Sequence, residues 1–208
     1  MGALEGHSDV VQCMMKHPQS LSTIISGSCD GEVRLWNLPT KKCVRKINAY
    51  SGIVRGICAP QHGQYFFTVD NQAAIKQWTL QPEDEEDDEF DPNVPMNTII
   101  GKQMTMGMHH HYKKPIIATC GERLELYEES RPEPIATYKW GDDSIHSVKF
   151  NPVETDIMAS TASDRSIILY DSRVAKPLRK VVLQMRSNTL SWNPMQAYYF
   201  TVANEDYK

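Results

Sequence analysis

The sequence predicts an all-β fold of the β-propeller class, because two independent markers recur along the chain at a similar spacing. Four similar segments, spaced by 42, 49 and 43 residues, close on the aromatic residues Trp36, Trp78, Tyr127 and Tyr170. The first predicted strand of four repeats is followed by a proline, at Pro18, Pro60, Pro152 and Pro194. Proline lacks a backbone N–H and suits the turn where a strand ends. A period of this length is typical of four-stranded propeller blades.

Short apolar runs bounded by turn residues define the strands of the first two predicted blades. In the blade near residues 1–47 we expect strands at Val10–Met15, Thr23–Ser28, Val33–Asn37 and Lys42–Ile47. In the blade near residues 48–101 we expect Val54–Ala59, Tyr65–Val69, Ala74–Leu80 and, after an insert at residues 82–96, Asn97–Gly101.

The same pattern continues through the rest of the chain. The blade near residues 102–140 should contain strands at Met104–His110, Ile116–Cys120, Arg123–Glu128 and Ile135–Trp140. The blade near residues 141–183 should contain Ile145–Phe150, Ile157–Ala162, Ser166–Asp171 and Lys176–Leu183. Residues 184–208 supply only Thr189–Asn193 and Tyr198–Asn204, and the next closing aromatic is due about four residues later. We therefore expect an incomplete propeller, about four and a half blades of a ring of roughly seven, with a closed ring of four or five blades as the alternative.

Charge is distributed unevenly. The net charge is −4, but residues 83–91 carry eight carboxylates and no base, and without them the chain has a net charge of +4. Like charges resist burial, so residues 82–96 are predicted to form a disordered surface loop. The loop either only solvates the surface, or attracts a basic partner or mimics a phosphate backbone.

Composition excludes several classes of protein. No run of 18 apolar residues is present, so no membrane span is expected, and the N-terminus lacks the pattern of a secretory signal. The cysteines form no Cys-x-x-Cys motif and are odd in number, which favours a reducing compartment, cytosol or nucleus; they are Cys13, Cys29, Cys43, Cys58 and Cys120. No phosphate-binding loop or hydrolase elbow motif occurs, so neither a cofactor nor a small-molecule substrate is expected.

The first repeat begins with Gly6-His7 and ends with Trp36-Asn37, which resembles a WD40 repeat. In such a repeat four residues form a buried hydrogen-bonded tetrad, here His7, Ser26, Asp30 and Trp36. The tetrad is predicted to lock the strands of the blade together. The same His, Asp and Ser also suggest a triad hydrolase, a remote alternative. The later repeats are degenerate, with Tyr50, Thr68 and Gln72 in the second, Gly121 in the third, and Ser160, Asp164 and Tyr170 in the fourth.

His109, His110 and His111 form the one cluster that suggests a metal site. Successive residues of a strand point to opposite faces, so three in a row do not converge on one ion without a turn. No metal is predicted, and a metal-dependent hydrolase is kept only as a remote alternative. Basic residues near strand ends could hold phosphates if they share one surface; they include Lys42, Arg45, Arg55, Lys114, Lys180 and Arg186.

Taken in order, several segments resemble the WD-and-Sof-domain family of WD40-repeat proteins. They are GSCDGEVRLWN (27–37), GIVRGIC (52–58), SIHSVKFNP (144–152), ASDRSIILYD (162–171), NTLSWNP (188–194) and ANEDY (203–207). The resemblance implies a nucleolar, non-catalytic scaffold in small ribosomal subunit biogenesis. Its implied partners are proteins of the small-subunit processome, the U3 small nucleolar ribonucleoprotein and precursor ribosomal RNA.

The same resemblance implies an alternative function, because animal members of the family are described as substrate receptors of a cullin-RING ubiquitin ligase. Their adaptor-docking motif is Trp-Asp-x-Arg, and this chain has Tyr170-Asp171-Ser172-Arg173. Arg173 would offer a planar fork of donors to the ligase adaptor beside Asp171. In the competing structural interpretation, Asp171 and Arg173 only tie their blade to its neighbour.

Overall fold

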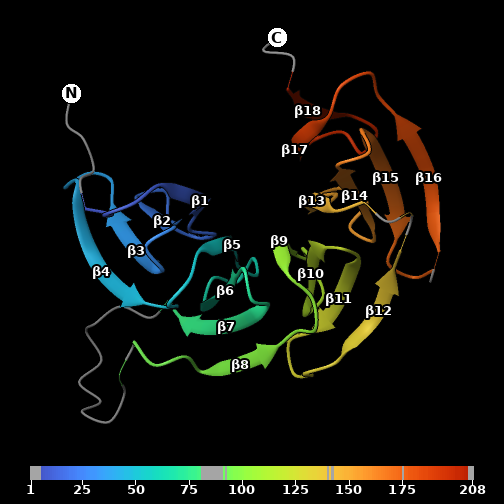
Figure 1. Cartoon of the computed structure of the whole chain (residues 1–208). Helices are drawn as coiled ribbons and strands as arrows, with labels where there is room; N and C mark the ends of the chain where they lie inside the picture. The colour runs from blue at the N-terminus through green and yellow to red at the C-terminus, as the bar shows by residue number, and fades with distance from the viewer. Residues whose placement is uncertain are drawn as a thin grey trace. The chain divides into compact units, whose positions relative to one another are not determined.

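The structure is a computed structural model that describes residues 6–80, 91, 93–139, 141, 143–174 and 176–205. All regular elements of these residues are β-strands, which confirms the predicted all-β architecture (Figure 1). The described residues include no helix long and apolar enough to span a membrane. The chain divides into two compact units, Met1–Lys102 and Gln103–Lys208, which are taken in turn.

The first unit contains two antiparallel sheets of four strands, each paired in chain order (Figure 1). One sheet consists of β1 (Val11–Lys16), β2 (Thr23–Ser28), β3 (Glu32–Asn37) and β4 (Lys42–Asn48). The other consists of β5 (Val54–Cys58), β6 (Tyr65–Asp70), β7 (Ala74–Thr79) and β8 (Asn97–Ile100). Of the insert predicted at residues 82–96, positions 82–90 and 92 lie outside the described residues. At its end, the Val94 N–H donates to the Asp91 carbonyl and closes a turn (3.1 Å).

The core of the first unit lies between its two sheets, where β1 and β2 contact β5. Gly27 is needed at this point, because a Cβ there would lie 2.6 Å from Cγ1 of Val54 and 2.9 Å from Sγ of Cys13. The core is made of side chains from both sheets, namely Ile25, Val33, Leu35, Ile47, Ala49, Val54, Ile57, Phe66 and Trp78. The two sheets of this unit thus bury apolar faces against each other, as neighbouring blades of a propeller do.

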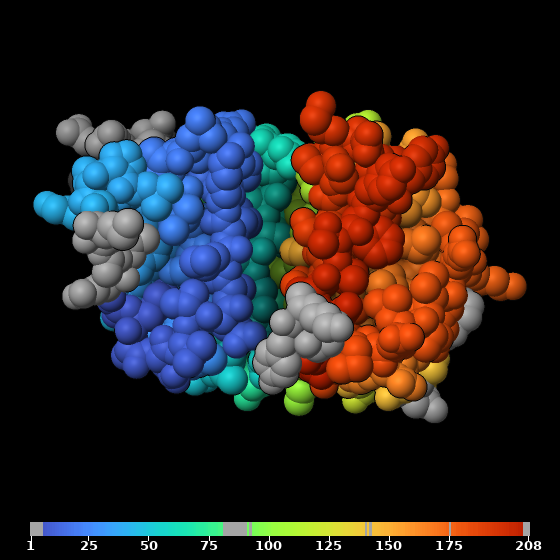
Figure 2. Space-filling view, turned by 90° about the horizontal axis from the view of Figure 1, so that it is seen from above, coloured from blue at the N-terminus to red at the C-terminus, as the bar shows by residue number. Residues whose placement is uncertain are grey.

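The second unit has two further four-stranded antiparallel sheets and a hairpin. One sheet consists of β9 (Thr105–His110), β10 (Ile116–Gly121), β11 (Leu124–Glu128) and β12 (Pro134–Tyr138). The other consists of β13 (Ile145–Phe150), β14 (Ile157–Ala162), β15 (Ser166–Asp171) and β16 (Pro177–Val182). The hairpin is formed by β17 (Ser187–Trp192) and β18 (Phe200–Asn204). β13 contacts both β9 and β17, and Figure 2 shows the red hairpin lying beside the orange sheet.

Most strand bounds differ from the sequence-based ones by one or two residues. Pro134 already pairs with Tyr127, although a strand was expected only from Ile135, and the expected end Trp140 lies outside the described residues. β18 begins at Phe200 instead of Tyr198, because the Tyr199 N–H donates to the Gln196 carbonyl in a turn. These differences concern ends of elements and leave their order unchanged.

Two irregularities of pairing recur in the sheets. The first strand of every sheet has one extra residue near its start, at Gln12, Arg55, Met106, His146 and Asn188. Three outer strands have one extra residue beside the closing aromatic, at Val44, Ile135 and Leu178. Each is a β-bulge, which bends its strand and increases the local twist. The β-bulges therefore recur from sheet to sheet together with the rest of the repeat.

Candidate functional site

The structure brings the four residues of the sequence-predicted tetrad together around Ser26. The Trp36 Nε1–H donates to the Ser26 Oγ (2.7 Å), which is also 2.7 Å from Nε2 of His7. Nδ1 of His7 lies 3.1 Å from Oδ2 of Asp30. In the neutral ring Nδ1–H donates to the carboxylate and Nε2 accepts the serine proton. One continuous chain of hydrogen bonds thus joins β2, β3 and the segment before β1.

Asp30 is the anionic end of this chain. Burial alone would raise the pKa of its carboxyl, but the backbone N–H groups of Glu32 and Ser8, together with the His7 and Ser28 side chains, lower it to about 2. The Glu32 N–H donates to Oδ1 (2.9 Å) and the Ser8 N–H to Oδ2 (3.0 Å). Asp30 therefore stays ionised and fixes the turn between β2 and β3.

We predict a pH dependence of stability from this carboxyl. Its folded pKa of about 2 lies below the ordinary value of 3.8, so its contribution is full above pH 4 and is lost as pH falls toward 2. At pH 3 the lost part is about 1 kcal/mol. Urea unfolding at pH 5 and pH 3 should show the unchanged protein losing about 1 kcal/mol more free energy of unfolding than Asp30→Asn. Equal losses in the two proteins would contradict the prediction.

The His7, Ser26 and Asp30 distances also resemble those of a hydrolase triad, so the surroundings of the serine decide its chemistry. Ser26 is only 3% exposed. Its oxygen already accepts the indole N–H of Trp36. A nucleophile needs donors placed for the developing oxyanion rather than for its own oxygen. The arrangement is suited to holding strands together.

The same corner holds one group with metal-ligand geometry. Potential ligand atoms of His7, Asp30 and Glu32 all lie within 4.8 Å of one another. Each is already used within the unit, because His7 bonds Asp30 and both Glu32 oxygens pair with the cations of Arg34 (2.7 Å) and Lys46 (2.5 Å). A cation would have to displace these partners.

The second predicted site, Asp171 and Arg173, lies in the turn after β15. The Arg173 Nε–H donates to Oδ1 of Asp171 (2.9 Å) and Nη2–H to Oδ2 (2.6 Å), a bidentate pair. The hydrogen bonds from Arg173 lower the pKa of the Asp171 carboxyl. The Asp171 side chain is 9% exposed, whereas that of Arg173 is 63% exposed. The other guanidinium N–H groups have no hydrogen-bond partner among the described residues.

This turn is anchored from two directions. The Tyr138 hydroxyl, on β12 of the preceding sheet, donates to the Asp171 carbonyl (3.3 Å). The Ser172 N–H and hydroxyl donate to the carbonyl and Oδ1 of Asp156 (2.8 and 3.1 Å). The tie to the neighbouring sheet thus runs through the Asp171 backbone, and the Asp171 side chain holds Arg173 at the surface.

Comparison with known proteins gives consistent matches. Residues 1–37 match the family "WD domain, G-beta repeat". The chain is 51% identical to "DDB1- and CUL4-associated factor 13" of Danio rerio over its whole length and 50% identical to the Homo sapiens protein of that name over 92% of it. It is 34% identical over 97% of its length to "Protein SOF1" of Saccharomyces cerevisiae.

The chain belongs to the WD-and-Sof family of WD40-repeat proteins. It spans 46%, 42% and 45% of the three relatives, about half their length. The sheets are therefore WD40 propeller blades, and the predicted fold class is confirmed. The number of blades in a closed ring stays a prediction.

The degenerate blades of this WD-and-Sof chain keep a polar contact at the closing aromatic with other residues. In the second blade the Tyr50 hydroxyl and the Trp78 Nε1–H both reach Oγ1 of Thr68 (2.8 and 2.9 Å). In the fourth the Tyr170 hydroxyl lies 3.1 Å from Oγ of Ser160. In the third the Tyr127 hydroxyl donates to the Glu125 carboxylate (2.8 Å).

Sequence comparison between blades missed two acidic residues with structural roles, Asp70 and Glu125. Asp70, not Gln72, caps the turn of the second blade, because its Oδ1 accepts the N–H groups of Gln72 and Ala74 (2.9 and 2.8 Å). Glu125 lies on β11, two residues before the aromatic it binds. Each is displaced from the expected position by a few residues, so a search at the fixed period passes over it.

The three consecutive histidines each have a different set of partners. Nδ1 of His109 accepts the Phe150 N–H (3.3 Å), and Nε2 of His110 lies 2.6 Å from the Glu129 carboxylate. Nδ1 of His111 accepts the N–H groups of Lys113 and Lys114 (2.9 and 3.0 Å). The rings therefore act as separate local contacts in the second unit.

Several of the basic residues considered as phosphate ligands are held by acceptors of their own unit. Arg45 is 8% exposed and donates to the Thr79 carbonyl (2.8 Å), so its guanidinium is largely withdrawn from the surface. Lys114 pairs with Asp156, Lys180 with Asp164 (2.5 Å) and Arg186 with Glu205 (3.5 Å). These pairs lower the positive potential available to a phosphate.

Proposed function

We propose that this chain is the propeller portion of a non-catalytic scaffold in small ribosomal subunit biogenesis. Its place of action is the nucleolus, and its partners are processome proteins, the U3 small nucleolar ribonucleoprotein and precursor ribosomal RNA. Membership of the WD-and-Sof family, through similarity along the whole chain, carries this proposal. The five cysteines, all within the described residues, are not in disulfide bonds, which agrees with a nuclear location.

The geometry supports a scaffold over an enzyme. The constellation closest to a catalytic one, His7, Ser26 and Asp30, is tied to Trp36 and serves to join strands. Rigid sheets that present loops and strand ends are suited to binding several macromolecules at once. A fluorophosphonate probe that labelled Ser26 in the full-length protein would contradict the non-catalytic assignment.

Affinity purification tests the scaffold function directly. The tagged full-length protein is purified from nuclear extract in two halves, one treated with nuclease. We expect small-subunit precursor RNA and its assembly factors to be enriched in the untreated half. Loss of the factors after nuclease would assign the contact to RNA, and their retention would assign it to protein. Recovery of ligase subunits without precursor RNA would contradict the proposal.

A second function is favoured by one observation, the exposed Arg173 held by Asp171 at the end of a repeat. The vertebrate relatives are, by their name, DDB1- and CUL4-associated. We propose that Arg173 contacts the adaptor of a cullin ligase, so that the chain also acts as a substrate receptor. Tyr170 replaces the tryptophan of the family motif, and its hydroxyl lies within hydrogen-bond distance of the buried Ser160. The two functions are compatible in one protein.

A further inference from the structure

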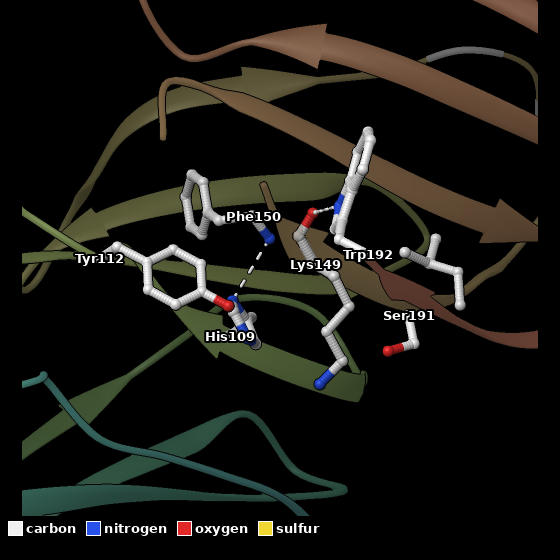
Figure 3. Close-up of a pocket in the computed structure, with 7 residues that line it drawn as sticks. His109, Tyr112, Lys149, Phe150, Ser191 and Trp192 are labelled. Carbon is white, nitrogen blue, oxygen red and sulfur yellow. Dashed lines mark hydrogen bonds between the residues drawn. The ribbon is translucent and has the colours of Figure 1, made fainter. Parts of the chain in front are cut away.

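A pocket of about 200 Å³ lies at the ends of three neighbouring first strands of the second unit (Figure 3). His109 comes from β9, Lys149 and Phe150 from β13, and Ser191 and Trp192 from β17. Tyr112 follows β9, and in Figure 3 Tyr112 and Ser191 lie on either side of the Lys149 side chain. Neither of the two sites described above includes any of these side chains.

His109 is a hydrogen-bond donor in this pocket. Burial, followed by the charge of Lys149, holds its pKa well below 6.5, so the ring is neutral at physiological pH. Its Nδ1 accepts the backbone N–H of Phe150 (3.3 Å), which leaves the ring hydrogen on Nε2. That Nε2–H has no acceptor among the described residues.

Two hydroxyl groups of the pocket, like this Nε2–H, make no hydrogen bond with the described residues. Burial raises the pKa of Tyr112, so its phenol keeps the proton. The hydroxyl groups of Tyr112 and Ser191 have no hydrogen-bond partner among the described residues. The Trp192 N–H, in contrast, donates to the Lys149 carbonyl (3.0 Å), so this indole presents an apolar ring to the pocket. Three donors and an apolar wall therefore surround one small space.

Among the described residues that line the pocket, Lys149 is the charged one and none is a carboxylate. Groups that donate hydrogen bonds beside a cation are complementary to an anion with several acceptor sites, which a carboxylate provides. The volume is below the roughly 300 Å³ at which pockets for larger ligands begin, so it suits one side chain rather than a nucleotide.

We propose that this pocket binds the carboxylate side chain of a glutamate or aspartate presented by a partner protein. Lys149 supplies the charge, while His109, Tyr112 and Ser191 donate hydrogen bonds. The ring of Trp192 contacts the methylene groups of the bound side chain. The site is independent of the proposed function, because it requires neither RNA nor the ligase adaptor.

Saturation-transfer NMR on the full-length protein tests this with two capped pentapeptides that have leucines around a central glutamate or glutamine. The glutamate peptide should bind about tenfold more tightly or better, because the charge-assisted hydrogen bonds are lost with glutamine. Equal affinities would overturn the proposal. Hexauridylate is the nucleic-acid probe. If it binds while the glutamate peptide does not, and the variants below lose that binding, the pocket is assigned to nucleic acid and the proposal is overturned as well.

Two variants locate the binding. Lys149→Glu reverses the charge, and Ser191→Glu introduces a carboxylate at an exposed position, so the second folds even if the first does not. Both should lose binding of the glutamate peptide. Lys176→Glu is the matched control, an exposed lysine outside the pocket, and should keep it. Binding retained in Ser191→Glu, or lost equally in Lys176→Glu, would overturn the proposal.

Discussion

Changing Arg173 to glutamate should weaken binding to the ligase adaptor by about a hundredfold or more, while the association with small-subunit precursors is retained. The change removes the donors that Arg173 would offer to the adaptor, and the introduced carboxylate adds repulsion beside Asp171. The arginine side chain is 63% exposed, so the fold should tolerate the change. Binding is measured by titrating purified DDB1 into the full-length protein.

Arg131→Glu is the matched control for this prediction. Arg131 is exposed to a similar degree (66%) and pairs with Glu128 (2.9 Å) in the corresponding turn of the preceding sheet. It should leave adaptor binding unchanged. An Arg173→Glu protein that binds the adaptor as the unchanged protein does would rule out docking through this residue. A simultaneous loss of precursor RNA would show that the change acts on the fold.

Replacing Ser26 with alanine should lower the free energy of unfolding by about 3 kcal/mol. The change leaves the Trp36 N–H and Nε2 of His7 without a partner, and each buried polar group left unpaired costs about 1–3 kcal/mol. Trp36 is 4% exposed and Ser26 is 3% exposed. Urea unfolding followed by tryptophan fluorescence measures the effect.

Ser26→Thr provides the comparison, because Thr68 performs the same role in the second blade and accepts the Trp78 N–H. The threonine variant keeps the oxygen and should recover most of the stability. A loss below about 1 kcal/mol in Ser26→Ala would mean that the hydrogen-bond chain contributes little beyond packing.

Much of the fold was predictable because its determinants are local and periodic. The closing aromatics and prolines mark each repeat by position alone, and the four residues of the tetrad follow a fixed spacing. The substitutions elsewhere were harder to assign. The sequence shows a tyrosine at position 50, but it does not show that the hydroxyl of this tyrosine contacts Thr68. That contact depends on the distance between β6 and the segment before β5.

The pocket could not be predicted, because its residues come from three strands about 40 residues apart. His109 attracted attention in the sequence as part of a metal cluster, and only its contact with the Phe150 N–H shows which nitrogen donates. Ser191 and Tyr112 carry no motif. Burial of Arg45 was missed for a similar reason, because the carbonyl of Thr79 that it binds belongs to another sheet.

The bulges at Val44, Ile135 and Leu178 have a consequence for how the protein behaves at high concentration. β4, β12 and β16 are the terminal strands of their sheets, so each has an open side on which another chain could add a strand. The three bulge residues are also exposed and apolar, at 53%, 45% and 53%. An extra residue interrupts the regular row of N–H and C=O groups that an added strand needs. The departure from regular pairing therefore protects these edges against aggregation.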